Sequence, residues 1–472
     1  MNRSEKLARN TLILSLGTFL PKLAGFVTLP ILTAYLTKDE YGTYDLVTVL
    51  VSLLLPSVTL QLKAAAFRFL IDAREDRTEQ RRIVTNILAF SLPVSLAALG
   101  ILFFVLRGIS PAIRLWICLY YLLDMAVGTV RQIARGLSRN LFYSVSAILS
   151  AAFQMIVAVL AVRTAGLGLK GAVIALCAGT LVSLLYLSVR IRLWSFLDVS
   201  LIRRASLREM IRYSWPLVPN ELSMWVMRVS DRVVVTSVLG LAANAVYAVA
   251  NKIPSIISLA QGSLTLAWQE NASLVSGDRD ANEYYSRMYH VMMRIQAGVF
   301  CLVLGLSPWL FRFLVRGDYT EAYSHMPILA LGIFYASIAT YLGGIYIAHK
   351  QSRSVGMTTL AAAIVNLAVH LACIGWMGLY AASGSTLVSY LFLCAYRMID
   401  VRKIAKLRYD AKEILLAHLV MAPAAALFYV NHPAARWGNA AFGAAVLLLL
   451  NRNLVKSGIR RVQAFLGKHR TK

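Results

Sequence analysis

The feature that most constrains this chain is a succession of apolar runs, each about as long as a bilayer is thick. A helix needs about 20 apolar residues to cross the hydrocarbon core. Runs of that length recur along the 472 residues, often separated by only a few polar ones. They predict an all-α polytopic membrane protein. Its fourteen transmembrane helices are expected at 11–36, 41–63, 84–106, 113–135, 141–163, 170–190, 214–239, 245–268, 287–311, 323–348, 355–376, 379–400, 413–430 and 438–455.

The charge distribution predicts how these helices are oriented. The hydrophobic content of 58% exceeds what the polar surface of a soluble domain allows, and the net charge is +26. Basic residues concentrate in alternate connections: about 34 in one set and about 8 in the other. The positive-inside rule therefore predicts that both termini are cytoplasmic. Because this placement accounts for the charge, no nucleic-acid partner is expected.

The N-terminus and the cysteines add no cleavable signal and no metal site. The basic start MNRSEKLARN precedes an apolar stretch that is too long for a signal-peptide core, so it reads as a retained first span. The five cysteines lie singly inside apolar runs, without a CxxC or a Cys/His spacing. No metal and no cofactor are expected.

A weak internal repeat predicts how the spans are grouped. Residues 133–139 resemble 347–353, and 168–172, 180–183 and 42–44 resemble 378–382, 386–389 and 245–247 in the same order. The offset of roughly 200 residues covers six spans, and an even number of crossings makes the two copies parallel. We expect an N-terminal lobe at 1–212, a C-terminal lobe at 213–412 and a central cavity between them. Residues 413–472 would add spans 13 and 14 and a basic cytoplasmic tail.

One apolar run carries an unusual number of charges. Between Trp215 and Lys252 it includes Glu221, Arg228 and Asp231. Ionised groups at bilayer depth almost always face a wet cavity or a partner, because insertion costs about 2.5–3.5 kcal/mol each. Helical spacing places Glu221 and Arg228 on one face with the charged pair at 231 and 232. The sequence therefore predicts a hydrated interior that suits an anion.

Short motifs then carry a resemblance to a known family. They are Leu36–Tyr44 (LTKDEYGTY), Pro216–Pro219 (PLVP), Asp231–Arg232 and Tyr247–Lys252 (YAVANK). Together with fourteen spans in parallel lobes, they resemble the polysaccharide-transporter (Wzx-like oligosaccharide flippase) branch of the multidrug/oligosaccharidyl-lipid/polysaccharide (MOP) exporter superfamily. The branch usually has a glycine two residues before the tyrosine of the last motif, where this chain has Ala245.

The resemblance implies a MATE-like fold and a transporter rather than an enzyme. Such a flippase moves a polyprenyl-diphosphate-linked oligosaccharide repeat unit from the cytoplasmic to the outer leaflet, for lipopolysaccharide, exopolysaccharide or another cell-surface polysaccharide. Its two lobes would alternate access to a cationic cavity. The implied location is the bacterial cytoplasmic membrane. The implied partners are the lipid-linked glycan, the bilayer and a polysaccharide polymerase or assembly complex.

Six polar residues inside the spans are candidates for binding this substrate. A guanidinium is always charged and holds phosphate oxygens in bidentate geometry, which makes Arg228 the strongest candidate for the diphosphate. Amides such as Asn251, with Asn244 and Tyr247 beside it, suit sugar hydroxyls. The full predicted set is Lys22, Asp45, Arg228, Arg232, Asn251 and Lys252.

Three acidic residues are candidates for gating or cation coupling. Glu221 would repel an anion, so pairing with a basic residue or a cation suits it better. Asp231 can neutralise Arg232 or close a gate, and Asp124 is expected to pair with nearby basic residues or to take part in proton coupling. Because spans beyond the ninth carry almost no charge, anion recognition is expected in spans 1, 2, 7 and 8.

Other functions remain as alternatives. A lipid II flippase has the same architecture, whereas a cation-coupled multidrug exporter of the same superfamily is expected to have acidic cavity residues. An integral-membrane glycan polymerase or ligase is the alternative from the enzyme class. The short outer connections leave little room for its catalytic domain, and the chain contains no GxxxxGK[ST], HExxH or GxSxG motif.

Overall fold

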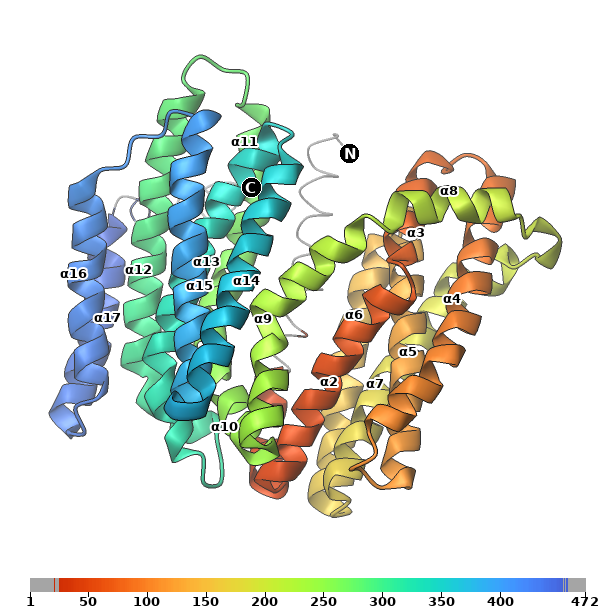
Figure 1. Ribbon diagram of the computed structural model, residues 1–472, viewed down its shortest axis with the longest axis horizontal. Coiled ribbons are helices and arrows are strands. Elements are labelled where there is room, and N and C mark those ends of the chain that lie inside the picture. The colour runs from red at the N-terminus through yellow and green to blue at the C-terminus, as the bar shows by residue number, and fades with distance from the viewer. Residues whose placement is uncertain (1–20, 22–24, 453, 455, 457–472) are drawn as a thin grey trace, which may run out of the picture. The chain divides into compact units, whose positions relative to one another are not determined.

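The computed structural model describes residues 21, 25–452, 454 and 456, and these residues form helices joined by turns, without a strand (Figure 1). Eleven of its helices are long and apolar enough to cross a membrane, and they match eleven predicted spans. The other three predictions fall elsewhere. Span 1 is described mainly over the short apolar helix Gly25–Tyr35. Span 7 forms the charged helix α9 (Leu217–Leu239), and span 8 is divided between α10 (Leu241–Lys252) and α11 (Ser255–Leu274).

The chain forms two compact units. The first comprises Met1–Ala245 with Leu314–Gly317, and the second comprises Val246–Phe313 with Asp318–Lys472. The division therefore falls inside α10 rather than at 212. The lobe boundaries drawn from the repeat stay a prediction about internal symmetry, and the last predicted segment extends beyond the described residues.

The first unit is a bundle around two apolar cores. Its helices are α2 (Lys38–Val58), α3 (Leu62–Asp72), α4 (Arg77–Val105), α5 (Pro111–Gly136), α6 (Asn140–Ala158), α7 (Gly168–Ile191), α8 (Arg204–Ser214) and α9. One core joins α3, α4, α5, α7 and α8, with Leu62, Leu70 and Ile133 fully buried. The other joins α2, α4, α5 and α7 around Val47 and Tyr121.

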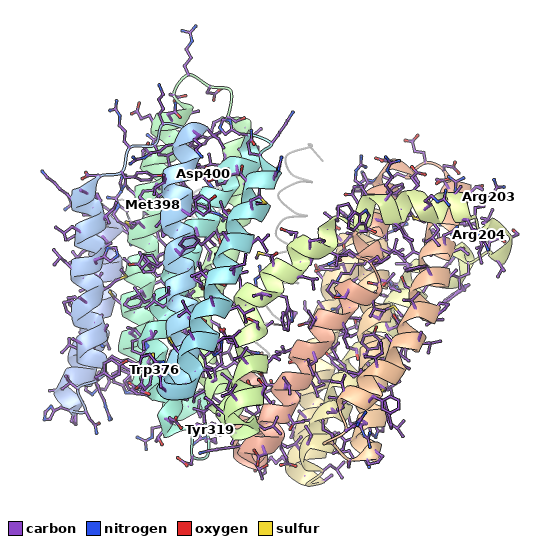
Figure 2. The ribbon with its side chains drawn as sticks, viewed as in Figure 1. Arg203, Arg204, Tyr319, Trp376, Met398 and Asp400 are labelled. Atoms are coloured by element: carbon purple, nitrogen blue, oxygen red, sulfur yellow. The ribbon has the colours of Figure 1, made fainter. Side chains whose placement is uncertain are left out.

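One predicted boundary in this unit, the end of span 2, is wrong. The span predicted at 41–63 ends at Val58, because Leu60 and Gln61 adopt left-handed backbone conformations with φ of 47° and 56°. Lys63 consequently lies in the first turn of the separate helix α3. The connection between spans 6 and 7 contains the helix α8, whose start at Arg203 and Arg204 is labelled in Figure 2.

The second unit contains α11, α12 (Ala281–Leu314), α13 (Thr320–Ala348), α14 (Ser352–Met377), α15 (Leu379–Asp400), α16 (Ala411–Phe428) and α17 (Pro433–Leu450). Within it, Tyr319 and Trp376 lie at one end and Met398 and Asp400 at the opposite end (Figure 2). Glycines let α12 and α17 approach closely: a Cβ on Gly305 would meet the Asn439 backbone at 2.6 Å. Small residues at helix contacts are typical of membrane bundles.

Candidate functional site

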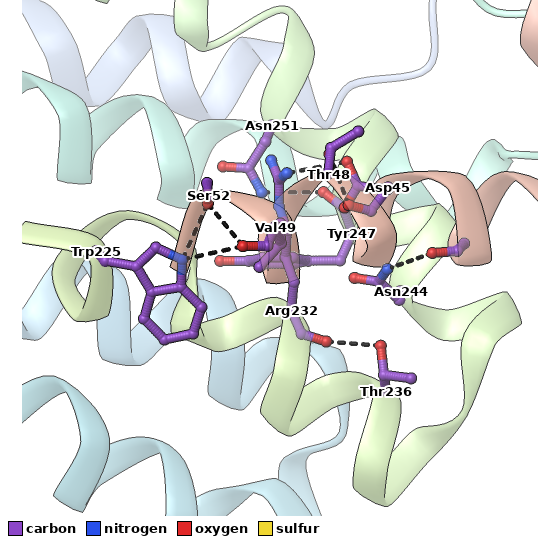
Figure 3. Close-up of polar contacts among 11 residues, drawn as sticks. Asp45, Thr48, Val49, Ser52, Trp225, Arg232, Thr236, Asn244, Tyr247 and Asn251 are labelled. Carbon is purple, nitrogen blue, oxygen red and sulfur yellow. Dashed lines mark hydrogen bonds and ion pairs between the residues drawn. The ribbon is translucent and has the colours of Figure 1, made fainter. Parts of the chain in front are cut away.

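The predicted charged face of span 7 packs along α2. The indole Nε1 of Trp225 donates to the Val49 carbonyl at 3.2 Å and to Ser52 Oγ at 3.1 Å (Figure 3). Two turns further along α9, Arg232 Nη1 lies 2.9 Å from Asp45 Oδ1. The later residue of α9 contacts the earlier residue of α2, so the two helices are antiparallel. We call this contact the α2–α9 seam.

An ion pair between Asp45 and Arg232 closes one part of the seam. The Asp45 side chain is only 6% exposed and that of Arg232 only 18%. Separating such a pair would leave a charge in a poorly solvated place, which is unfavourable. Asp45 Oδ2 has no hydrogen-bond partner within the described part of the chain. Both residues belong to the predicted binding set. In this structure each neutralises the charge of the other.

Arg228 lies on the same side of α9 and is exposed. It follows Trp225 by three residues and precedes Arg232 by four, so helical periodicity places it between two residues that touch α2. Among the described residues, Arg228 makes no ion pair with a carboxylate. Glu221 is also exposed on this side, but two turns, about 10 Å along the axis, separate it from Arg228. No carboxylate of the described residues neutralises this guanidinium, which suits the binding of an external anion.

The remaining candidates are distributed over several elements. Asp231 is buried at 2% exposure. Asn251 and Lys252 are half-buried at the end of α10, and Asn251 donates its amide to the Tyr247 carbonyl at 2.9 Å. The helix breaks at Pro254, where α10 gives way to α11. Lys22 lies outside the described residues.

Two further polar groups of α10 are used inside the protein. Asn244 is fully buried and donates its amide to the Gly42 carbonyl at 3.0 Å. The Tyr247 hydroxyl is buried against α15, 3.3 Å from Thr386 Oγ1. In this structure both groups bond to other helices of their own unit, and their predicted binding of a sugar stays a prediction. Spacing alone does not distinguish a helix face that binds substrate from one that binds another helix.

Asp124 has the surroundings expected of it. This half-buried residue of α5 experiences the positive charges of Lys63 and Arg131. Arg131 Nη2 also donates to Ser183 Oγ at 3.0 Å. The cations come from α3 and from the next turns of α5, so the carboxylate helps to join two elements of the first unit. Its predicted role in coupling stays a prediction.

Sequence reasoning missed a buried arginine in the second unit. Arg397 of α15 is 5% exposed and donates to the Ala339 carbonyl at 2.7 Å, Thr359 Oγ1 at 3.0 Å and Thr358 Oγ1 at 3.1 Å. A fourth bond, of 3.3 Å, reaches the Val355 carbonyl. The adjacent threonines on α14 were the available signal. Their hydroxyls and two backbone carbonyls satisfy the guanidinium in place of a carboxylate.

Comparisons with known proteins agree with this arrangement of helices. The sequence matches the family described as "Polysaccharide biosynthesis protein" over residues 7–270, which is more than half of the chain. The chain belongs to this family. It is a branch of the MOP superfamily, as the sequence motifs predicted. No curated protein matches the chain.

Several solved structures share the fold. The lipid II flippase MurJ, in an inward closed conformation, matches with a TM-score of 0.73 at 13% identity, covering 94% of this chain and 100% of MurJ. An inward-facing multidrug resistance MATE transporter matches with a TM-score of 0.66 at 12% identity, covering 83% and 95% of the two chains. A MOP transporter from Pyrococcus furiosus, whose structure is described as having a binding pocket of reverse polarity, matches with a TM-score of 0.59 at 12% identity and covers 84% and 95%.

The first of the four family motifs, Leu36–Tyr44, has a structural role in this protein. Thr37 caps α2, and Glu40 completes the capping box while its Oε1 accepts from the Leu169 amide of α7 at 3.0 Å. A Cβ on Gly42 would collide with the Leu241 carbonyl. Glycine is therefore required where α2 meets the start of α10. These residues hold one end of α2 in place rather than bind a ligand.

Proposed function

We propose that this protein is a flippase that moves a polyprenyl-diphosphate-linked oligosaccharide repeat unit from the cytoplasmic to the outer leaflet. One observation carries the proposal: Arg228, on a helix of a membrane protein, is exposed and makes no ion pair within the described part of the chain. Membership in the polysaccharide biosynthesis protein family supports a lipid-linked glycan as the cargo.

The diphosphate is the part of this cargo that Arg228 would bind. A guanidinium forms two parallel hydrogen bonds to phosphate oxygens, which are stronger than neutral ones. Arg232 would join it when the diphosphate replaces Asp45 as its partner, since both arginines lie on the same side of α9 one turn apart. The lipid tail would stay in the bilayer while the two lobes alternate access to the headgroup.

The experiment that tests the proposal is a leaflet-specific assay in proteoliposomes. A labelled diphosphate-linked oligosaccharide is placed in one leaflet, and its appearance in the other is detected with a membrane-impermeant glycosidase. We expect Arg228→Ala to reduce the flipping rate at least tenfold. Arg228→Lys should fall between this variant and the wild type, because lysine keeps the charge but loses the bidentate geometry.

Arg163→Ala is the matched control, because it removes an exposed arginine of the same unit, five residues after the end of α6. Its rate should equal that of the wild type. A wild-type rate in Arg228→Ala would refute the anion site. Loss of flipping in both variants would also refute it, since the effect would then follow from net charge. Lys22→Ala provides a further test of the predicted cationic passage.

Lipid II carries the same diphosphate, and MurJ shares this fold. A parallel arm with labelled lipid II separates the two substrates: faster flipping of lipid II than of the oligosaccharide would reassign the cargo. The glycan polymerase alternative predicts lengthened products instead of translocation, which gel analysis of the same reactions detects.

A further inference from the structure

A second cationic feature lies far along the chain from the α2–α9 seam, in a cavity of the second unit. The cavity has a volume of about 440 Å³, within the usual range for small-ligand sites. It is formed where α12 and α16 end and where α13 and α17 begin. The residues that line it are Pro308, Phe311, Arg312, Thr320, Tyr323, Ser324, Phe428, Tyr429, Val430, Asn431 and Arg436.

The lining is positively charged. It includes two arginines and no carboxylate, and the acidic residues nearest in sequence, Asp318 and Glu321, are not part of it. Arg436 donates to Asn431 Oδ1, a neutral partner. Arg312 is exposed and makes no ion pair with any described residue. Two guanidinium groups that share a cavity without a counter-ion favour an anion.

The position of the two arginines along the chain strengthens this inference. Both lie in the set of connections that carries only about eight basic residues, the set predicted to face outward. Arginines are sparse on that side of a membrane protein, yet two of these few converge on one cavity. The orientation of the protein in the membrane does not require arginines on this side. A binding role therefore explains their presence better.

Aromatic side chains place the mouth of the cavity at the membrane surface. Trp437 and Phe313 are 67% and 70% exposed beside it, and Trp437 lies 4.7 Å from the Trp309 ring. Exposed tryptophans at the ends of spans are typical of headgroup depth. Inside the cavity, Tyr323 and Phe428 stack with their centroids 4.2 Å apart, which provides an apolar wall next to the charged one.

We propose that this cavity binds the phosphate of an anionic lipid headgroup from the leaflet at this end of the helices. Arg312 and Arg436 bind the phosphate oxygens, and the Tyr323–Phe428 wall contacts the glycerol and the first methylenes of the lipid. The site is independent of flipping, so the failure of one proposal leaves the other unaffected.

The test measures the binding of soluble short-chain lipids to the purified protein by isothermal titration calorimetry. Dihexanoyl phosphatidylglycerol is the probe, with dihexanoyl phosphatidylcholine and inorganic phosphate as comparisons. We expect phosphatidylglycerol to bind at least tenfold more tightly than phosphatidylcholine. Arg312→Gln should weaken the binding of phosphatidylglycerol at least tenfold. Arg312→Gln is the informative variant. Arg436 also donates to Asn431, so a substitution of Arg436 would disturb the turn between α16 and α17.

The control is the double variant Arg107→Gln/Arg163→Gln, which removes two exposed arginines from the same predicted side in the other unit. Its affinity for phosphatidylglycerol should equal that of the wild type. Equal affinity in Arg312→Gln and the wild type would overturn the site. Arginine-dependent binding of inorganic phosphate as tight as that of the lipid would overturn the lipid as its source. If both probes bind and only the lipid loses affinity in Arg312→Gln, the proposal is supported.

Discussion

Two arginines inside the helical region of this protein have opposite surroundings. Arg397, in the second unit, is buried and donates four hydrogen bonds to carbonyls and threonine hydroxyls of α13 and α14. Arg228, on α9 in the first unit, is exposed and makes no ion pair among the described residues. Both would count equally in any list of charges within predicted spans.

The difference teaches how to separate scaffold from site in such a chain. A buried guanidinium that uses four of its five donors on its own protein, as Arg397 does, joins helices and has little left to offer a ligand. A guanidinium that the fold leaves exposed between contacts to a neighbouring helix keeps its donors available. The Asp45–Arg232 pair is intermediate, because each charge is satisfied by a side chain of the same unit while Arg232 stays partly exposed.

The largest effect on stability is expected from Arg397→Met. Methionine fills a similar volume but removes four hydrogen bonds between helices, each worth about 0.6 kcal/mol in membrane proteins. We expect the free energy of unfolding in mixed micelles to fall by about 2–3 kcal/mol. Lys406→Gln, an exposed neighbour in sequence, should leave it unchanged. A loss below 0.5 kcal/mol in Arg397→Met would mean that the arginine is not a structural link.

Asp45→Asn should have the next largest effect. It leaves Arg232 half-buried beside a neutral amide, so we expect a loss of about 1–2 kcal/mol in the same measurement. Arg232→Gln in the Asp45→Asn background should recover part of that loss, because an amide pair replaces an unpaired charge. Strictly additive losses in the double variant would show that the two side chains do not interact.

Trp225→Phe should have a small effect on the seam. The ring is kept, but the indole donor to Val49 and Ser52 is lost, so a decrease of about 0.6 kcal/mol is expected. The intrinsic fluorescence of the other tryptophans reports the unfolding transition. A loss equal to that of Arg397→Met would contradict the view that the seam is the weaker of the two regions.

Arg228→Gln should be the least destabilising of the four variants. An exposed side chain without partners contributes within about 0.5 kcal/mol. Normal stability together with slow flipping would sharpen the contrast with Arg397, whereas a loss of 2 kcal/mol would erase it and point to a structural role for Arg228. Thermal unfolding and the proteoliposome rate, measured on one preparation, decide between these outcomes.

Much of the fold could be predicted because bilayer thickness imposes one length on every span. Eleven predicted spans match apolar helices, and the break at Pro254 follows from the missing amide of proline. The end of span 2 could not be predicted, since residues 58–63 are apolar enough to continue a helix. The left-handed turn at Leu60 and Gln61 instead allows α3 to pack on α4, α5 and α8.

The candidate site was predicted less evenly. Helical periodicity placed Trp225, Arg228 and Arg232 on one side of α9, and the seam with α2 agrees with it. The same reasoning assigned Asn244 and Tyr247 to sugar binding, although both are buried against other helices. It also overlooked Arg397, whose position near the end of a span resembles that of an ordinary cytoplasmic anchor.

Sequence by itself determined the class of this protein, its family and the helix faces that carry charge, because each depends on local length, composition and spacing. Tertiary structure alone decided which charged side chains are paired within the protein. Whether an arginine meets Asp45, two threonines or no carboxylate among the described residues depends on which distant segment packs beside it. In a poorly solvated interior, that contact determines whether a charge stabilises the fold or remains available to a ligand.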